Sequence, residues 1–282
     1  MSDSFIFQSW NCFGAAQTAS GFFRGRGVID SERFLHHHVS ALCEAADVLC
    51  VQELWAAEAV EFFGRRSHPH KNRDDNEVSW RPLAFGGSGL GIASRHPFVS
   101  VNHRAFTPPH VGAERFARKG WLHARVTIGP VALDVITTHL QSGDGMSAAR
   151  VRARQLAELR ALVESECSSG HAVIVCGDFN VDGHAPSPIE REALEQATRG
   201  FVDLGAEAKL STFDPHNNTL AAREGKHAQP QRLDYVFFRP PTQGARVDPV
   251  EVSLALHDRL PIVARPLYAS DHAAIRVKLH ID

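Results

Sequence analysis

The stretch AVIVCGDFN, residues 172–180, is the most informative part of the chain, because an unbroken apolar run stops there at an acid and an amide. A short run rich in valine and isoleucine, bounded by polar residues, predicts a buried strand. Asp178 and Asn180 would then lie at the strand end, where the sheet meets solvent and where binding sites are commonly built.

Other apolar runs in the chain stop at polar residues in the same way. The residues at these stops are Asn11, Glu53, His139, Asp234, and Asp271 with His272. Carboxylates, amides and imidazoles in one set suit an oxygen-ligated metal and proton transfer. The set does not suit a thiolate metal site or a serine triad.

The composition narrows the class of protein. The chain has 282 residues, of which 43% are hydrophobic and 22% charged, as in ordinary soluble globular proteins, and we expect one domain over residues 1–282. The formal net charge is -2 and the sequence pI about 6.8. Because no global basic field would concentrate the protein on a polyanion, the sequence argues against nucleic acid as a partner and leaves the oligomeric state open.

The sequence also bears on location. No apolar stretch approaches the roughly 20 residues that a membrane-spanning helix needs. The N-terminal segment MSDSFIFQSWNC lacks the basic and apolar regions of an export signal. We therefore expect a cytoplasmic protein without a transmembrane segment, with secretion by a non-classical route left open. The five cysteines agree with a reducing compartment, since Cys50 and Cys176 fall within predicted strands and are expected to be reduced core residues.

Strand and helix patterns alternate along the chain without a linker. A strand over residues 5–10 precedes one helix over 34–46, and residues 121–128 and 131–138 alternate around Gly129-Pro130 as a hairpin would. A long helix is predicted from 147 to 166, with its arginines Arg150, Arg152, Arg154 and Arg160 largely facing solvent. Further strands are expected at residues 48–52, 172–176, 233–238, 250–256 and 274–279. The alternation predicts a layered α/β sandwich.

Two segments rich in histidine or in basic residues are not expected to form a binding site. His36, His37 and His38 lie on the predicted helix 34–46, where successive side chains diverge by about 100° and cannot share one ion. The basic stretch is expected to form a mobile solvated loop and consists of Arg65, Arg66, His68, His70, Lys71 and Arg73.

The polar residues at which the apolar runs end lie in six short motifs. The motifs are SWN at 9–11, VQE at 51–53, THL at 138–140, GDFN at 177–180, LDYVF at 233–237 and SDH at 270–272. Their order, across nearly the whole chain, resembles the endonuclease/exonuclease/phosphatase superfamily, whose fold is DNase I-like. The resemblance implies one catalytic domain, a four-layer α/β sandwich with two central mixed β-sheets, and Mg²⁺-dependent cleavage of a phosphate ester.

Three further segments resemble the neutral sphingomyelinases and bacterial sphingomyelinase C. These are SGLGIASRHPF at 88–98, RKG at 118–120 and TFDPHNNTLA at 212–221. The resemblance implies a phosphodiesterase, using Mg²⁺ or else Mn²⁺ or Co²⁺, that hydrolyses sphingomyelin or a related choline or ethanolamine phospholipid at a membrane or micelle surface. The products would be a lipid alcohol and a phosphorylated headgroup. The alternatives are a nucleic-acid or inositol-phosphate phosphoesterase on the same fold, and a catalytically silent interaction module.

The chain departs from that branch in two places. Some secreted bacterial members carry an exposed aromatic hairpin before SDH that inserts into the bilayer, whereas this chain has Leu260, Pro261, Ile262 and Val263 there. In several relatives an acid precedes a glycine turn, but here the position is filled by Gly86-Gly87-Ser88. The second departure leaves the partner of His139 unidentified.

Residue chemistry assigns the metal ligands. Mg²⁺ prefers hard oxygen ligands and keeps several waters, so Glu53 with Asn11 nearby is an adequate protein contribution. Asp271 is expected to join them, with the cap of a helix or turn as its alternative role. Asp178 is expected to orient either the attacking water or the metal.

The remaining polar residues are assigned to catalysis and substrate binding. His272 is the predicted general base, because an ordinary imidazole accepts a proton near neutral pH. The resemblance places Asp234 beside it, where a carboxylate would fix the imidazole tautomer. Asn180 and His139 would donate to phosphate oxygens. By resemblance, Lys119 either contacts the phosphate or headgroup or is a solvated charge.

Overall fold

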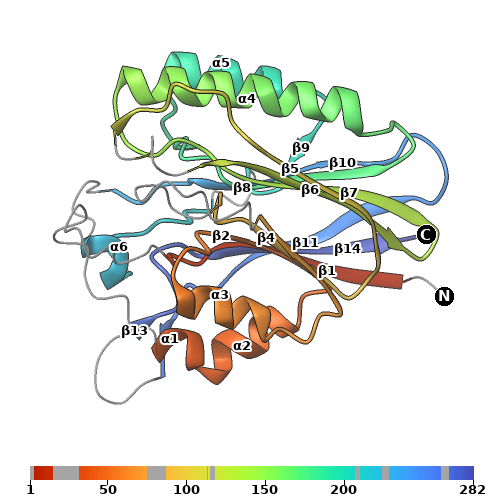
Figure 1. Ribbon diagram of the computed structural model, residues 1–282, viewed down its shortest axis with the longest axis horizontal. Helices are drawn as coiled ribbons and strands as arrows, with labels where there is room; N and C mark the ends of the chain where they lie inside the picture. Colours follow the sequence, from red (N-terminus) through yellow and green to blue (C-terminus); the bar gives the residue numbers. More distant parts are fainter. Residues whose placement is uncertain are drawn as a thin grey trace.

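Two six-stranded mixed sheets, packed face to face, form the centre of the protein (Figure 1). The structure is a computed structural model that describes residues 3–14, 32–74, 87–112, 114, 118–206, 210–223, 229–261 and 267–282. Helices cover the outer face of each sheet, so the layers run helix, sheet, sheet, helix. The predicted four-layer α/β sandwich with two central mixed β-sheets is confirmed.

The first sheet has the strand order β11-β14-β1-β2-β4-β3. Only β1 and β2 are parallel neighbours within it. Its strands are β1 (Asp3–Asn11), β2 (Val48–Gln52), β3 (His70–Arg73), β4 (Gly91–Ser94), β11 (Val247–Ala255) and β14 (Ala274–Ile281). Its outer face is covered by α1 (Glu32–Leu35), α2 (His37–Glu44) and α3 (Ala57–Gly64).

The second sheet has the order β5-β6-β7-β8-β10-β9, and only β7 and β8 are parallel neighbours. Its strands are β5 (Phe98–Ala105), β6 (Gly120–Ile128), β7 (Val131–His139), β8 (Ala172–Asp178), β9 (Val202–Asp203) and β10 (Asp234–Arg239). The helices α4 (Met146–Glu166) and α5 (Pro188–Ala197) cover its outer face. A short helix α6 (Thr219–Arg223) and the small hairpin of β12 (Arg259–Leu260) and β13 (Leu267–Tyr268) complete the described elements.

Side-chain alternation explains why each central strand is apolar on both faces. Successive residues of a strand point to opposite sides. In β1, Phe5 and Phe7 enter the core between the two sheets, whereas Trp10 packs with the helices α1 to α3. In β8, Ile174 faces the other sheet and Val175 faces α4. Because both faces are covered by protein, these strands appear in the sequence as continuous apolar runs.

The structure corrects the prediction of one continuous helix over residues 34–46. The backbone at His36 is extended, with φ −71° and ψ 125°, so α1 and α2 are separate helices. The Nδ1 atom of His36 accepts a hydrogen bond from the backbone N–H of His38 at 3.2 Å. A side chain that satisfies this N–H caps the start of α2, and such caps mark helix boundaries.

Two predictions about basic residues were wrong. Arg152 is buried rather than solvent-facing, because its guanidinium pairs with Glu190 of α5 and donates to the carbonyl oxygens of Gln141 and Gly143. The stretch from Arg65 to Arg73 is not a loop throughout, because β3 occupies its second half. Within that stretch, Arg66 and His68 are buried.

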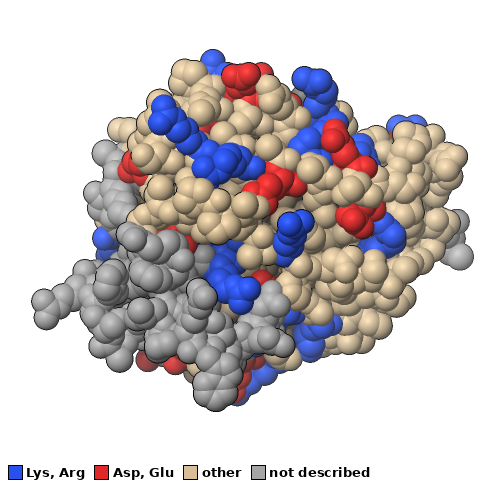
Figure 2. All heavy atoms as spheres, turned by 45° about the horizontal axis from the view of Figure 1, so that its top comes forward, with Lys and Arg blue, Asp and Glu red and all other residues tan. Residues whose placement is uncertain are grey.

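The surface agrees with the near-neutral composition. On the face that Figure 2 presents, Lys and Arg side chains lie among Asp and Glu side chains rather than in one basic field. Among the described residues, no helix has the length and hydropathy needed to span a membrane. Gly86 of the predicted glycine turn, together with Ile262 and Val263, lies outside the described residues.

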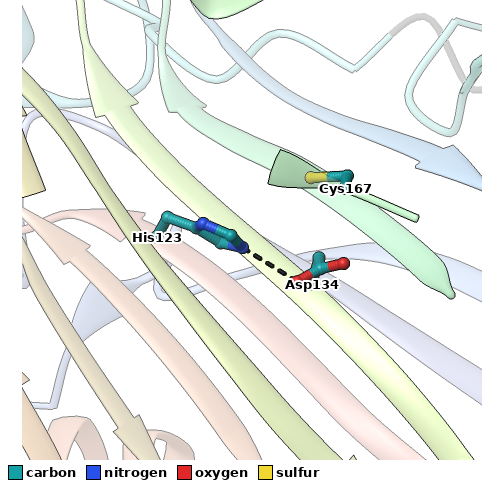
Figure 3. Close-up of side chains that lie close together, drawn as sticks. All are labelled: His123, Asp134 and Cys167. Atoms are coloured by element: carbon teal, nitrogen blue, oxygen red, sulfur yellow. Dashed lines mark hydrogen bonds and ion pairs between the residues drawn. The ribbon is translucent and has the colours of Figure 1, made fainter. Parts of the chain in front are cut away.

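A buried polar cluster joins β6, β7 and the end of α4. Figure 3 shows the His123 and Asp134 side chains pointing toward one another, with Cys167 to one side, and the His123 Nε2–Asp134 Oδ1 distance is 2.9 Å. Asp134 also accepts from Arg125 Nε at 2.9 Å and contacts His171 Nδ1 at 2.8 Å. Although burial opposes ionisation, these hydrogen bonds outweigh it and hold the pKa of Asp134 below its ordinary value.

The Asp134 cluster predicts a pH-dependent contribution to stability. Asp134→Asn should lower the free energy of unfolding by about 3 kcal/mol at pH 7, because it leaves the Arg125 guanidinium without its buried carboxylate. Since the folded pKa of Asp134 is depressed, this contribution is complete above the unfolded pKa of about 3.9 and is lost as the pH falls through the folded pKa. Urea unfolding at pH 7 and at lower pH values measures the difference.

A matched control uses an exposed ion pair. Asp248 pairs with Arg246 at the surface, so Asp248→Asn should change the free energy of unfolding by less than about 0.5 kcal/mol. Equal stability of the wild-type protein and Asp134→Asn at pH 7 would show that the cluster does not hold α4 to the second sheet.

Candidate active site

The polar strand ends predicted from the sequence converge on one end of the sandwich, opposite the two chain termini in Figure 1. Strand register brings together the three polar residues of the second sheet. Asp178 of β8 is the partner of His139 in β7 and of Asp234 in β10. In the first sheet Asn11 of β1 is the partner of Gln52, which directly precedes Glu53. Residues from the two sheets therefore face one another across a single site.

The GDFN turn places Asp178 and Asn180 by a close backbone approach. Gly177 has φ +129°, and a Cβ atom there would lie 2.0 Å from the Thr138 carbonyl oxygen, so only glycine fits. Asn180 also has a positive φ of 51°, and its backbone N–H donates to Asp178 Oδ1 at 2.8 Å. Strained backbone of this kind concentrates at functional sites.

Asn11, Glu53 and Asp178 form the centre of the site. Asn11 Nδ2 donates to Glu53 Oε1 at 3.2 Å and, across the two sheets, to Asp178 Oδ2 at 3.0 Å. Burial, supplemented by the charge of Asp271, raises the pKa of Glu53 to about 7. Burial also raises the pKa of Asp178 to about 6. Without a bound cation, ionisation of these two neighbouring carboxylates is therefore unfavourable.

This donor set fits a hard divalent cation. Asp178 is buried and Glu53 is partly buried, and their raised pKa values indicate that they lack a sufficient compensating positive charge, which a cation would supply. Glu53 Oε1, Asp178 Oδ2 and His139 Nε2 belong to a group whose ligand atoms all lie within 4.8 Å of one another. The Asp271 charge acts on both Glu53 and His272, which agrees with a position at the same site. The roles of Glu53, Asn11 and Asp271 as metal ligands remain predictions.

His272 and Asp234 form a pair that joins the two sheets. His272 Nδ1 lies 2.7 Å from Asp234 Oδ2, and both side chains are buried. Burial alone would lower the pKa of His272, but the Asp234 and Asp271 carboxylates outweigh it and raise that pKa well above its ordinary value. The other ring nitrogen, Nε2, lies 4.0 Å from Asp178 Oδ2. The pair has the geometry of a general base with an orienting carboxylate.

His139 has a partner that the sequence did not reveal. Its Nε2 atom lies 2.9 Å from the ammonium of Lys119, which also donates to the Leu140 carbonyl oxygen at 2.7 Å and pairs with Glu114 Oε2 at 2.6 Å. Burial and the Lys119 charge hold the pKa of His139 well below its ordinary value, so the ring is neutral. Lys119 is buried, and it is therefore not the solvated charge that was one of its two predicted roles.

The segment at residues 212–218 supports the His272–Asp234 pair. Thr212 Oγ1 accepts from the backbone N–H groups of Leu233 and Asp234, both at 3.1 Å. The Phe213 ring packs edge-on against the His272 imidazole, with 5.3 Å between the ring centroids. Asn218 Nδ2 donates to the Ser270 carbonyl oxygen at 2.7 Å. The segment whose sequence resembles the sphingomyelinases thus packs against the predicted base, His272.

Ser270 and Glu114 were given no role from the sequence. The Ser270 hydroxyl donates to the Asn11 carbonyl oxygen at 2.7 Å and accepts from the His272 backbone N–H at 3.1 Å, which ties β1 to the start of β14. Ser270 lies within the SDH motif, which gave a signal for its importance. Glu114 lies in no motif, and its contact with Lys119 depends on the fold alone.

A cavity of about 330 Å³ opens beside the site. Asn180 lies on its wall, and its Nδ2 atom donates to the Leu140 carbonyl oxygen at 3.1 Å. Acidic, basic, neutral polar and apolar side chains line the rest of the wall, among them Asp144, Arg152, Gln231 and Leu233. The cavity is large enough for a small polar group attached to a phosphate.

Comparisons with known proteins agree with this geometry. The chain is 25% identical over 169 residues to phospholipase C of Staphylococcus aureus, which covers 58% of this chain and 50% of the relative. It is 28% identical over 182 residues to sphingomyelinase C of Leptospira interrogans, which covers 61% of this chain and 32% of that protein. The chain thus spans about half, or less, of the length of the curated relatives it matches.

Solved structures share the fold over almost the full chain. A variant of the Staphylococcus aureus beta toxin, crystallised with bound magnesium ions, has a TM-score of 0.73 at 18% identity and covers 98% of this chain and 99% of its own. Danio rerio TDP2, complexed with a single-strand DNA product, has a TM-score of 0.73 at 21% identity with the same coverage. At these identities the similarity shows the fold alone.

The family model assigns the chain directly. The model for the Endonuclease/Exonuclease/phosphatase family matches residues 9–272. This range begins two residues before Asn11 and ends at His272, so it includes every strand end of the site. The chain belongs to the Endonuclease/Exonuclease/phosphatase family.

Proposed function

We propose that the protein is a Mg²⁺-dependent phosphodiesterase of the sphingomyelinase type. It hydrolyses sphingomyelin or a related choline or ethanolamine phospholipid to a lipid alcohol and a phosphorylated headgroup. The observation that carries the proposal is the His272–Asp234 pair, held 2.7 Å apart across the two sheets and beside the carboxylates of Glu53 and Asp178. The names of the curated relatives, phospholipase C and sphingomyelinase C, support the choice of a phospholipid.

The site residues bind and orient the phosphate. Glu53, Asn11 and Asp271 would hold Mg²⁺, with Mn²⁺ or Co²⁺ as substitutes. The bound ion supplies charge compensation for the phosphate and for the leaving oxygen. Asn180 donates an amide N–H to one non-bridging oxygen. His139 is neutral, and the Lys119 ammonium beside its Nε2 gives this side of the site a positive charge for a second oxygen.

Proton transfer falls to His272. Because Nδ1 is committed to Asp234, Nε2 is the nitrogen that accepts the proton of the attacking water. Nε2 and Asp178 Oδ2 are 4.0 Å apart, so one water can contact both atoms and be oriented by Asp178. The water oxygen forms the new bond to phosphorus, the bond from phosphorus to the ester oxygen breaks, and the leaving oxygen takes a proton from solvent to give the lipid alcohol. The Asp234 carboxylate stabilises the imidazolium that results.

The cavity beside Asn180 supports a cationic headgroup. Arg152 and Glu190 on its wall are paired with each other, and the side chains of Asp144 and Asp182 lie on the same wall. A choline or ethanolamine ammonium would be attracted there. The lipid part of the substrate remains outside, at the membrane or micelle surface.

A second candidate function has a specific observation in its favour. The TDP2 structure with a single-strand DNA product matches this fold as well as the beta toxin does, with the same TM-score of 0.73. A nucleic-acid phosphoesterase is therefore the alternative. The net charge of -2 argues against it, because strong binding to a polyanion relies on basic surface.

A substrate panel tests the proposed function. The purified chain would be incubated with sphingomyelin, phosphatidylcholine, single-stranded DNA, abasic-site DNA, poly(A) and an inositol polyphosphate, each with Mg²⁺ or with EDTA. We expect release of a phosphorylated headgroup from sphingomyelin or phosphatidylcholine, dependent on Mg²⁺ and abolished by EDTA. Turnover of a nucleic acid alone would favour the alternative, and full activity after exhaustive chelation would remove the metal from the proposal.

Mutation of the His272–Asp234 pair tests the mechanism. His272→Ala should lower kcat by about 10² to 10⁴-fold with little change in KM, because proton transfer is felt in the transition state. The double variant with Asp234→Asn should be scarcely worse, since the two residues act as a unit. Losses that multiply would contradict this pairing, and His280→Ala, which removes a histidine that pairs with Asp282 at the surface, is the control.

The pH profile gives an independent check on the same pair. Only deprotonated His272 acts as a base, so kcat should rise with pH through its pKa. Asp234→Asn removes a charge that raises this pKa, and the rising limb should therefore move to lower pH while the maximum of kcat falls. An unchanged limb in Asp234→Asn would assign the titration to another group.

A further inference from the structure

The core between the two sheets changes from apolar to polar residues next to the site. At deeper levels the inward-facing residues are apolar, such as Phe7, Val135 and Ile174. The layer next to the site holds Ser9 of β1, Gln52 of β2 and Thr137 of β7, all of them buried. We call these three residues the polar layer. It separates the apolar core from the carboxylates of the site.

One amide connects the polar layer across both sheets. Gln52 Nε2 donates to Thr137 Oγ1 in the opposite sheet at 2.9 Å and lies 3.3 Å from Ser9 Oγ on the neighbouring strand. Gln52 Oε1, in contrast, has no hydrogen-bond partner among the described residues. A buried carbonyl oxygen without a partner destabilises the fold, so an apolar side chain would serve stability better at this position.

Each member of the polar layer lies next to a residue of the site. Ser9 and Thr137 precede Asn11 and His139 by two residues, so each pair points to the same face of its strand. Gln52 directly precedes Glu53, whose φ of +63° is strained for a non-glycine residue and persists only where the surroundings hold it. The Gln52 carbonyl oxygen accepts from the Cys12 backbone N–H at 3.1 Å, just past Asn11.

We propose that Gln52 is a positioning residue for the divalent metal site, acting through its hydrogen bond to Thr137. By joining the end of β2 to β7, it fixes the separation of the sheets where Glu53 and Asn11 face His139 and Asp178. The inference rests on the proposed function only in requiring that the site takes a divalent cation. Its test therefore measures metal binding in place of turnover.

A merely structural role for Gln52 makes the opposite prediction. If the amide serves stability, its loss lowers Tm and leaves the affinity for metal unchanged. If it serves the site, the loss weakens metal binding while Tm stays the same or rises, because the unsatisfied Oε1 is also removed. Loss of residues that orient metal ligands typically costs about 10 to 100-fold in metal affinity.

The experiment is a Mn²⁺ titration of the metal-stripped protein, followed by the EPR signal of free Mn²⁺. Mn²⁺ accepts the same oxygen ligands as Mg²⁺. Gln52→Leu should bind Mn²⁺ at least about 10-fold more weakly than the wild type, with a metal-free Tm that is not lowered. The matched control is Gln8→Leu, because Gln8 is an equally buried amide that contacts Cys43 on the other face of the first sheet. Its Mn²⁺ affinity should equal that of the wild type.

Thr137 supplies the second arm of the test. Thr137→Val should weaken Mn²⁺ binding as Gln52→Leu does, Thr137→Ser should retain it, and the double variant should be no worse than either single one. Thr138→Val is the control, since Thr138 donates to the Gly120 carbonyl oxygen on the opposite face of β7. If Gln52→Leu does not fold, the Thr137 variants carry the same test.

The outcomes separate the two proposals. Wild-type protein that binds Mn²⁺ while Gln52→Leu binds it within twofold overturns the role of Gln52 and leaves the proposed function intact. Wild-type protein that binds no Mn²⁺ overturns both. A lowered Tm in Gln52→Leu with unchanged affinity assigns the amide to stability alone.

Discussion

The cost of burying carboxylates between two sheets is the constraint on which the site depends. Asp178 and Asp234 lie at the ends of two strands of the second sheet, Glu53 directly follows β2 of the first, and each is tied to a neighbour by a side-chain hydrogen bond. The Asn11 amide crosses the interface between the sheets to Asp178, and the His272 ring crosses it to Asp234. Because burial raises the pKa values of Glu53 and Asp178, the protein holds negative charge where only a cation would fully compensate it. Affinity for a metal and the geometry of the base therefore arise from the same packing of sheets.

The apolar central strands, the fold and the residues of the site could be predicted because they leave a local signal. An apolar run that ends in a polar residue marks both a buried strand and its exposed end, as at Asp178, and the order of the motifs identified the family. The register then brings these ends together, since neighbouring strands such as β7 and β8 end at partnered residues, His139 and Asp178. The roles assigned to the individual residues stay predictions, because they depend on a substrate and an ion.

The features that could not be predicted depend on contacts distant in sequence. The Glu114–Lys119–His139 network has no motif at Glu114, and the burial of Arg152 depends on Glu190 of α5, 38 residues away. The helix break at His36 arises from a side chain that accepts a hydrogen bond from the backbone N–H of His38, which helical spacing does not report. Gln52 lies inside a recognised motif, but its role is visible only when β2 faces β7. A periodic pattern reports which face is buried and not which group lies across from it.

The most direct test of the account is the position of the metal. Crystals soaked in Mn²⁺, with data collected at the manganese absorption edge, should give an anomalous peak that adjoins Glu53 between the two sheets. A candidate away from the active site is the cluster of His123, Asp134 and Cys167, whose ligand atoms also lie within 4.8 Å of one another. There Asp134 already pairs with Arg125, and we expect no peak. A peak at Asp134 with none at Glu53 would contradict the assignment of the site.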